Sequence, residues 1–194
     1  MNDRLLPHPD YCTVVLIDAQ DRLMKAMAGA AAAEHAMGKT LRTAGILGVD
    51  VVVTEQVPRA LRPTTDALLS ALPDGSPRLG KPTFSCWGDP AFSAALDAFR
   101  PRALVLAGME THVCVQQTAL EALARGYRVA VVADAVCSRR PFDRDTALRL
   151  LANRGVAVTT LEAIAFDWLR DSSDPRFKAV ASVVKSAPSD PSGA

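Results

Sequence analysis

The chain has 194 residues, of which 49% are hydrophobic and 22% charged, and its formal net charge at pH 7 is +1. This length suits one α/β domain with a sizeable buried core, and interspersed charges of near-neutral sum do not favour a nucleic-acid-binding surface. No apolar stretch approaches the roughly 20 residues that span a membrane, and the first residues lack the apolar core of a signal peptide.

The first part of the chain is predicted to alternate strands and helices, because short apolar runs are followed by turn-forming residues. In chain order we expect a strand over residues 12–17 ending at Asp18, a helix over 30–47 stopped by Gly48, a strand over 51–54, a loop over 56–65 after which Thr65 opens a short helix, and a strand over 78–80 with Lys81 at its end.

The alternation continues in the second part of the chain, where Asp89 is an expected N-cap and Pro90 the first helical residue of a helix to about residue 99. There follow an expected strand over 103–107, a helix over 111–125 ended by Gly126, a strand over 127–132, a helix from Asp143 to Gly155, a strand over 156–158, a helix capped by Thr160 through 168, and a short helix over 177–184. We expect one domain over residues 8–185 and a flexible polar tail over 186–194.

The strands are continuously apolar, which is typical of a parallel sheet covered on both faces. We therefore expect a three-layer α-β-α fold with six parallel strands in the Rossmann-like order 3-2-1-4-5-6. Ligands of such sheets bind beyond the carboxyl ends of the strands, where the strand order reverses. Asp18, Lys81 and Cys114 all fall at or just beyond such ends.

Cys114 follows the strand over 103–107 and the turn at Gly108. If Thr111 is the N-cap, Cys114 lies in the first helical turn, where the helix dipole and free backbone N–H groups favour a thiolate. It is then a candidate nucleophile. The alternative is a buried structural cysteine.

A carboxylate, a lysine and a cysteine make chemical sense together at one sheet edge. Asp18 can take the thiol proton of Cys114 and later give it to a leaving group. Lys81 is expected to lower the energy of the thiolate and to keep Asp18 ionised at rest. The alternatives are a helix N-cap for Asp18 and a solvated loop position for Lys81.

Several segments resemble the motifs of isochorismatase-like cysteine hydrolases. Residues 15–20 (VLIDAQ) resemble the family's hydrophobic-D-x-Q opening, residues 81–87 (KPTFSCW) its K-x-x-F-S segment, and residues 108–115 (GMETHVCV) its G-x-x-T-x-x-C-V signature. Residues 131–135 and 138–140 are similar to the segments that follow. The motifs occur in order over about residues 13–168, most of the chain.

The resemblance implies a catalytic triad of Asp18, Lys81 and Cys114, and a non-proline cis peptide bond between Met109 and Glu110. It also implies an oxyanion hole formed by the backbone N–H groups of Glu110 and Cys114. Members hydrolyse amides, imides or vinyl ethers, and many are oligomers. The zinc-binding Asp-x-His of the nicotinamidase branch has no counterpart in residues 54–58, so we expect neither a metal nor a cofactor.

Four further residues are candidates for substrate contact: Gln20, Phe84, Trp87 and His112. Core packing is the alternative for the two aromatic residues, loop bracing for Gln20, and an exposed helical position for His112. The arginines at 139 and 140 are candidates for binding an anionic substrate or for a structural or interfacial role. Cys86 is expected to be a small packed side chain, with a second reactive thiol as the alternative. Cys137 has no partner in the sequence, and we expect no functional role for it.

The sequence thus predicts a hydrolase that cleaves a small-molecule amide or related non-peptide C–N bond through a thioester on Cys114. The alternatives are isochorismatase-type vinyl-ether hydrolysis, a non-catalytic oligomeric relative and, less favoured, a redox role of Cys114 with Cys86. The four cysteines are scattered, so we expect reduced thiols and a cytoplasmic protein. The expected partners are a small-molecule substrate and further copies of this chain, with no nucleic acid and no membrane.

Overall fold

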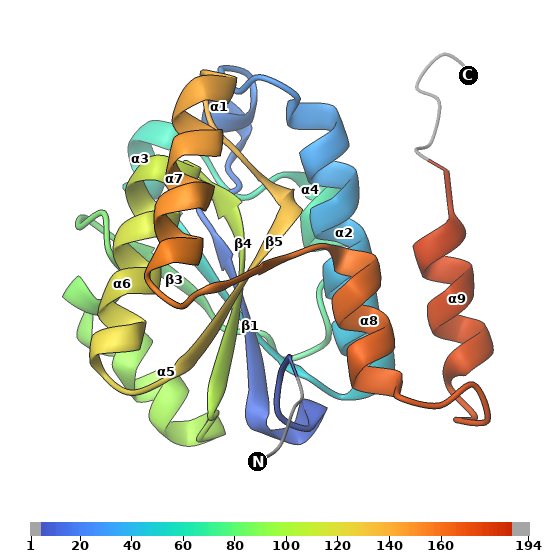
Figure 1. Ribbon diagram of the computed structural model, residues 1–194. Helices are drawn as coiled ribbons and strands as arrows, with labels where there is room; N and C mark the ends of the chain where they lie inside the picture. Colours follow the sequence, from blue (N-terminus) through green and yellow to red (C-terminus); the bar gives the residue numbers. More distant parts are fainter. Residues whose placement is uncertain (1–4, 188–194) are drawn as a thin grey trace.

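A six-stranded parallel sheet forms the centre of the computed structural model, which describes residues 5–187 (Figure 1). The order is β3-β2-β1-β4-β5-β6 and every pairing is parallel, which confirms the predicted fold. The strands are β1 (Cys12–Ile17), β2 (Asp50–Gln56), β3 (Arg78–Lys81), β4 (Ala103–Met109), β5 (Arg128–Cys137) and β6 (Ala157–Thr159). Their carboxyl ends therefore share one edge of the sheet.

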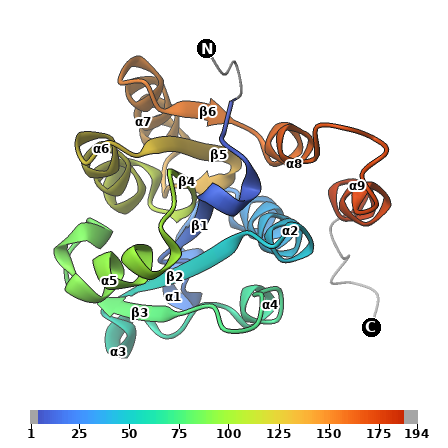
Figure 2. The ribbon, with the colours of Figure 1, turned by 90° about the horizontal axis from the view of Figure 1, so that it is seen from below.

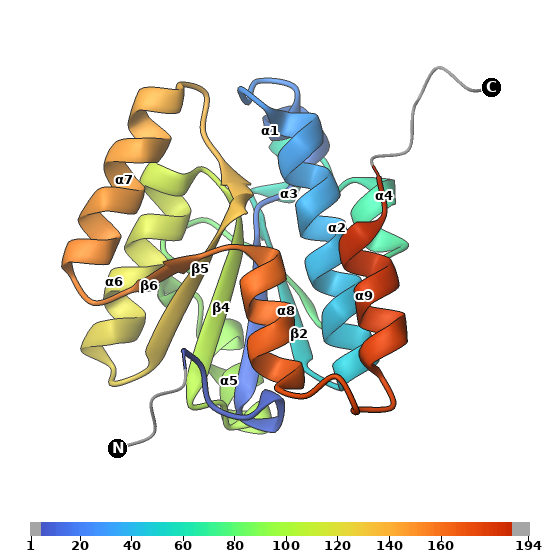
Figure 3. The same cartoon turned by 45° about the vertical axis from the view of Figure 1, so that its right-hand side comes forward.

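Helices cover both faces of this sheet, as Figure 2 shows from below. One face packs against α2 (Ala30–Leu47), α4 (Asp66–Leu69) and α8 (Leu161–Leu169), and α9 (Phe177–Lys185) lies outside α2 and α8 (Figure 3). The other face packs against α5 (Pro90–Phe99), α6 (Gln116–Ala124) and α7 (Pro141–Asn153). The short elements are η1 (Pro9–Tyr11), α1 (Asp21–Met24), α3 (Pro58–Leu61), η2 (Cys86–Gly88) and η3 (Thr111–Val115).

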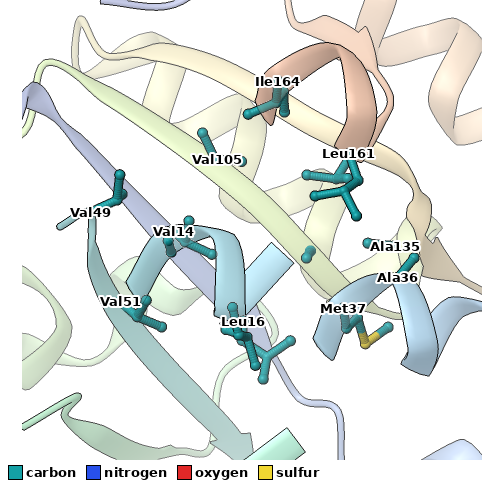
Figure 4. Close-up of a cluster of buried hydrophobic side chains, with 14 of the residues drawn as sticks. Val14, Leu16, Ala36, Met37, Val49, Val51, Val105, Ala135, Leu161 and Ile164 are labelled. Carbon is teal, nitrogen blue, oxygen red and sulfur yellow. The ribbon is translucent and has the colours of Figure 1, made fainter. Parts of the chain in front are cut away.

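The alternation of side chains along each strand divides the apolar core in two. In β1, Val14 and Leu16 face the α2 side, where they join Met37 and Leu161 in the cluster of Figure 4. Val15 and Ile17 face the other cluster, under α5, α6 and α7. Because both faces are covered, all six residues of β1 are buried, and all except Thr13 are apolar, in keeping with the sequence pattern.

Several elements differ from the sequence expectation. Helix α3 lies within the segment expected as a loop, α1 was not expected, and α7 begins at Pro141 instead of Asp143. The segment expected as one helix from Thr111 begins instead with the π-helical turn η3 before α6 starts. Strand β5 extends to Cys137 instead of ending at residue 132, because its register against β4 shifts after Leu106 and pairing resumes at Gly108 with Val136.

None of the helices within residues 5–187 is long and apolar enough to cross a membrane. The division into a domain over 8–185 and a tail over 186–194 stays a prediction, and residues 188–194 lie outside the described residues.

Candidate active site

Asp18 directly follows β1 and is fully buried, with 0% of its surface exposed. Its backbone is in the left-handed region at φ 52°, a conformation that Asp tolerates better than most residues. The Asp18 N–H donates to the Thr54 carbonyl at 3.0 Å, which keeps this turn against the end of β2. The side chain thus lies at the point where the strand order reverses.

Gly108 allows β4 to lie close against β1 near its end. Its φ is +119°, and a Cβ atom built there would lie 2.0 Å from the carbonyl oxygen of Ile17. Glycine is therefore required by both conformation and space. The next peptide bond but one, Met109–Glu110, is cis, at the position that the family resemblance implied.

The turn η3 places Cys114 beneath the sheet edge with 6% exposure. Thr111 does not act as the N-cap that the sequence predicted, since its hydroxyl donates to the Cys137 carbonyl at the end of β5 at 3.0 Å. The Val115 N–H instead donates to the Glu110 carbonyl at 3.2 Å, five residues back, which makes the turn π-helical. The hydroxyl of Thr111 therefore connects the turn η3 to the end of β5.

Lys81, the last residue of β3, is 2% exposed and fully engaged. Its Nζ lies 2.7 Å from Asp18 Oδ2, 2.8 Å from Gln56 Oε1, and 3.0 Å from the carbonyls of Thr83 and Phe84. A buried ammonium group with this many oxygen partners is compensated for the loss of water. The alternative of a solvated loop lysine is wrong.

Asp18 and Lys81 form a buried ion pair, and both act on the pKa of Cys114, so the structure brings the three side chains close together at one edge of the sheet. The electrostatics of the site differ from the sequence expectation. Burial, followed by the negative charge of Asp18, raises the pKa of Cys114 to about 12, and the positive charge of Lys81 only partly opposes this. The expected low-pKa thiolate is therefore wrong, and Cys114 rests as a thiol at neutral pH.

Burial also raises the pKa of Asp18 above its ordinary value. The Lys81 ammonium opposes this shift, and so do hydrogen bonds from Cys114 and from Thr54, whose Oγ1 lies 3.0 Å from Asp18 Oδ1. A carboxylate with a raised pKa is a stronger base than a solvated one. The pair therefore consists of a protonated thiol and a carboxylate suited to accept its proton.

Glu110, the expected source of one oxyanion-hole N–H, immediately precedes the turn η3. Its side chain accepts hydrogen bonds from the backbone N–H of Arg139 at 3.2 Å and from Arg139 Nε at 3.1 Å. This pair links the start of η3 to the loop after β5. It gives Arg139 a structural contact, one of the roles that the sequence left open.

Gln20 is buried, and its side-chain amide forms hydrogen bonds with backbone groups of neighbouring segments. Its Nε2 donates to the carbonyls of Gln56 at 3.1 Å and Arg62 at 2.6 Å, and its Oε1 accepts from the Gln56 N–H at 2.8 Å. Both amide hydrogens are therefore in use. This geometry matches the loop-bracing alternative rather than contact with substrate.

The two aromatic candidates have different surroundings. Trp87 is 9% exposed, packs edge-on against Phe92 with ring centroids 5.1 Å apart, and donates from Nε1 to the Thr118 carbonyl at 3.2 Å. It belongs to the core under α5 and α6, the alternative given for it. Phe84 is 56% exposed, and its carbonyl holds Lys81, so its ring stays a candidate for contact with substrate.

His112 lies two residues before Cys114, and its Nδ1 is 3.0 Å from the Ser138 hydroxyl. It borders a pocket of about 370 Å³ together with Arg139, Arg140 and Asp143. Arg140 forms a two-pronged pair with Asp143, at 2.7 and 3.0 Å, so much of its charge is already compensated. His112 thus borders a pocket and stays a candidate for contact with substrate.

Three polar residues of the site were not singled out from the sequence: Thr54, Gln56 and Thr118. Thr54 and Gln56 are spaced two apart at the end of β2 and so share one face of the strand. Polar residues at that spacing after an apolar run are the signal that could have found them. Thr118 gave no such signal, since it lies within a helix.

The end of β2 does not fit a metal site of the kind that nicotinamidases carry. The side chains of Thr54 and Gln56 form hydrogen bonds with Asp18 and Lys81, respectively. The Glu55 carboxylate accepts hydrogen bonds from the Thr64 N–H and hydroxyl at 2.8 and 2.9 Å. These three residues include no histidine, and their polar side-chain atoms already have hydrogen-bond partners within the protein.

Comparisons with known proteins agree with this architecture. The isochorismatase domain model matches residues 12–163. Isochorismatase domain-containing protein 1 from Salmo salar is 39% identical over 149 residues, which cover 77% of this chain and 52% of that protein. This chain thus spans about half the length of that curated relative.

Solved structures have the same fold over nearly the whole chain. The MAR1 ribonuclease structure from Caenorhabditis elegans has a TM-score of 0.89 and 29% identity, covering 97% of each chain. The YcaC gene product from Escherichia coli, described as an octameric hydrolase of unknown specificity, has a TM-score of 0.87 at 22% identity, covering 94% of this chain and 91% of that one, and shows the shared fold. With the domain match extending from the start of β1 into the first turn of α8, this chain belongs to the isochorismatase family.

Proposed function

We propose that this protein hydrolyses a small-molecule amide, or a related C–N bond other than a peptide bond, through a thioester on Cys114. Membership of the isochorismatase family supports a hydrolytic activity. The observation that carries the finer proposal is the Asp18–Lys81 ion pair with Cys114 close by, all three buried at the edge where ligands of such sheets bind.

In the first half of the reaction, the Asp18 carboxylate takes the proton of the Cys114 thiol while the sulfur attacks the carbonyl carbon. A C–S bond forms, and the electron pair of the carbonyl π bond moves to oxygen. When the carbonyl re-forms, the C–N bond breaks and Asp18 gives its proton to the leaving nitrogen. The products of this half are a free amine or ammonia and an acyl group held as a thioester.

In the second half, Asp18 is again a carboxylate and takes a proton from water. The resulting hydroxide attacks the thioester carbonyl, the C–S bond breaks, and the departing thiolate of Cys114 regains the proton from Asp18. The acid product leaves, and the site returns to its starting protonation state. No cofactor enters the balance of either half.

Lys81 and the turn around Glu110 have supporting roles in this proposal. The ammonium group of Lys81 compensates negative charge on Asp18 and on the sulfur as the proton moves. The backbone N–H groups of Glu110 and Cys114 stabilise the oxyanion of the tetrahedral intermediate. Phe84 and His112 are proposed to contact the substrate.

The test is a turnover screen of small amides, imides and vinyl ethers with wild type beside Cys114→Ala and Cys114→Ser. For an amide substrate we expect Cys114→Ala to lower kcat by roughly a thousandfold or more, and mass spectrometry of acid-quenched wild type to find an acyl adduct on Cys114. Cys12→Ala, which removes a buried cysteine from the opposite end of β1, is the matched control and is expected to stay active.

The screen also separates the alternatives. Undiminished turnover by Cys114→Ala with a vinyl ether, and no adduct, would point to acid catalysis by Asp18 alone, while no turnover of any substrate would favour a non-catalytic relative. RNA is included because the C. elegans protein is named a ribonuclease. We expect no RNA cleavage, since a net charge of +1 does not favour phosphate binding. We further propose a cytoplasmic homo-oligomer.

A further inference from the structure

A row of buried hydroxyl and thiol groups leads from α6 to Asp18. Thr118 Oγ1 lies 3.3 Å from Cys86 Sγ, Cys86 Sγ lies 3.7 Å from Thr54 Oγ1, and Thr54 Oγ1 lies 3.0 Å from Asp18 Oδ1. Each of the four residues is at most 1% exposed. Water therefore does not compete for these hydrogen bonds, and each group depends on its neighbours in the row.

The direction of the hydrogens in this row follows from counting donors. An ionised Asp18 only accepts, so the single hydroxyl proton of Thr54 points to Asp18 Oδ1. Thr118 Oγ1 already accepts from the Cys86 N–H at 3.1 Å, and its own proton points to Cys86 Sγ. The remaining contact, between Cys86 and Thr54, then has the Cys86 thiol as its donor.

Cys86 keeps the proton that this arrangement requires. Burial, and next the negative charge of Asp18, raise the pKa of Cys86 to about 11, so its thiol is protonated throughout the neutral range. Thr54 Oγ1 thereby accepts from the Cys86 thiol, while its own hydroxyl proton points to the Asp18 carboxylate.

The second oxygen of Asp18 is fixed from the other side. Asp18 Oδ2 accepts from Lys81 Nζ at 2.7 Å, and Cys114 acts on the pKa of the same carboxyl group. A rotation of the carboxyl plane would break the bonds to Thr54 and Lys81 together. The titratable groups that act on Asp18 are therefore Lys81 from β3 and Cys114 from η3, with Cys86 from η2 behind Thr54.

We propose that Cys86, together with Thr54 and Thr118, is a positioning residue that directs a hydroxyl proton onto Asp18 and holds its carboxylate in the plane from which it reaches Cys114. This inference rests on the proposed function, because it assigns the three residues to the orientation of the general base. It gives Cys86 a role that differs both from simple packing and from redox chemistry.

The experiment compares a variant that removes the donor with a variant that keeps it, at two positions. Thr54→Val and Cys86→Ala remove a donor, whereas Thr54→Ser and Cys86→Ser retain a hydroxyl at each place. The readout is the titration midpoint of the Asp18 carboxyl carbon by NMR in aspartate-labelled protein, assigned by its loss in Asp18→Asn. The acid limb of kcat/KM against pH is measured in the same proteins.

Because a carboxylate that loses a hydrogen-bond donor becomes easier to protonate, Thr54→Val should raise the Asp18 midpoint by about one pH unit. Cys86→Ala should raise it by less, and both serine variants should stay near wild type. The acid limb of kcat/KM should move upward in parallel. Cys12→Ala is the control for loss of a buried thiol and should change neither quantity.

An unchanged Asp18 midpoint in folded Thr54→Val and Cys86→Ala would overturn the inference and leave the proposed function standing, provided that Asp18→Asn is inactive. Full activity of Asp18→Asn would remove Asp18 as the base, and the inference would fall with the proposed function. If Thr54→Val does not fold, the comparison of Cys86→Ala with Cys86→Ser decides in the same way.

Discussion

The charged side chain of Lys81 is buried away from water, and its oxygen partners compensate for the lost hydration. It compensates one carboxylate and satisfies three further oxygens, from the side chain of Gln56 and the backbone of the loop after β3. Removing one member of a buried ion pair leaves the other charged and unpaired, which is more costly than the pair itself is favourable.

Lys81→Met is therefore expected to lower the free energy of unfolding at neutral pH by about 3–5 kcal/mol. Urea denaturation measures this, with Lys25→Met as the control, since Lys25 forms an exposed pair with Asp21 that is worth under about 1 kcal/mol. The loss should shrink at pH values low enough to protonate Asp18 in the variant. Equal effects of the two substitutions would contradict the described environment of Lys81.

Cys114 illustrates what the sequence predicted at the residue scale and what it did not. The strand ends and the family motifs placed Asp18, Lys81 and Cys114 at one edge, and the structure has them there. The pKa of the thiol could not be predicted, because it depends on how deeply the sulfur is buried and on its contact with a carboxylate. Helix position alone suggested the opposite direction.

The alkylation of Cys114 by iodoacetamide should be slow at neutral pH and should keep accelerating through pH 10, because the thiol has a pKa of about 12. Peptide mass spectrometry of protein labelled for fixed times measures the rate at each pH, with Cys12 as an internal comparison. A rate that levels off below pH 9 would contradict a raised pKa.

At the scale of elements, the approach of β4 to β1 depends on Gly108. Gly108→Ala adds a Cβ atom 2.0 Å from the Ile17 carbonyl oxygen and strains a backbone at φ +119°. We expect a loss of about 3 kcal/mol or more in the free energy of unfolding, with loss of turnover in the protein that still folds. Denaturant titration followed by circular dichroism provides the measurement.

Gly126→Ala is the matched control for this prediction. Gly126 also has a positive φ, of +87°, but a Cβ atom there would meet nothing within 4 Å. The substitution should cost about 1–2 kcal/mol, the strain of a left-handed residue alone. If the two glycines proved equally tolerant, close approach of the strands at Gly108 would be refuted.

The long elements were predictable because their periodicity and caps are local. Helix α2 covers Ala30–Leu47 and ends at Gly48, as expected, and Asp89 caps α5 through a bond to the Ala91 N–H. The turn η3 was not predictable, because Thr111 bonds to β5, which is distant in sequence. The extension of β5 was missed for a similar reason, since Asp134 interrupts its apolar run and accepts from the Leu161 N–H.

At the scale of the whole molecule, the buried thiols make the free energy of unfolding depend on pH in the alkaline range. The pKa is raised to about 11 or 12 at four positions: Cys12, Cys86, Cys114 and Cys137. Above about pH 9 the unfolded chain loses thiol protons that the folded chain keeps, so the unfolded state binds fewer protons. The free energy of unfolding must then fall as pH rises from about 9 toward 11.

Each buried thiol contributes up to about 1.4 kcal/mol per pH unit to this fall. Urea denaturation between pH 8 and pH 10.5 should therefore give a shallower slope for Cys12→Ala than for wild type. The slope is the relevant quantity, because the substitution also lowers stability at every pH. Identical slopes would show that Cys12 ionises equally well in the folded chain.

The order of the strands has a consequence for how the protein is made. Asp18 follows β1 and Cys114 follows β4, so about half of the chain separates two groups whose strands are direct neighbours. Parallel pairing of such distant segments is slow to form. A ribosome must release β4 before the Asp18 carboxyl group and the Cys114 sulfur can meet, so neither half of the chain carries the proposed active site by itself. Under the proposed function, turnover therefore requires that β1, β3 and β4 have come together in the sheet.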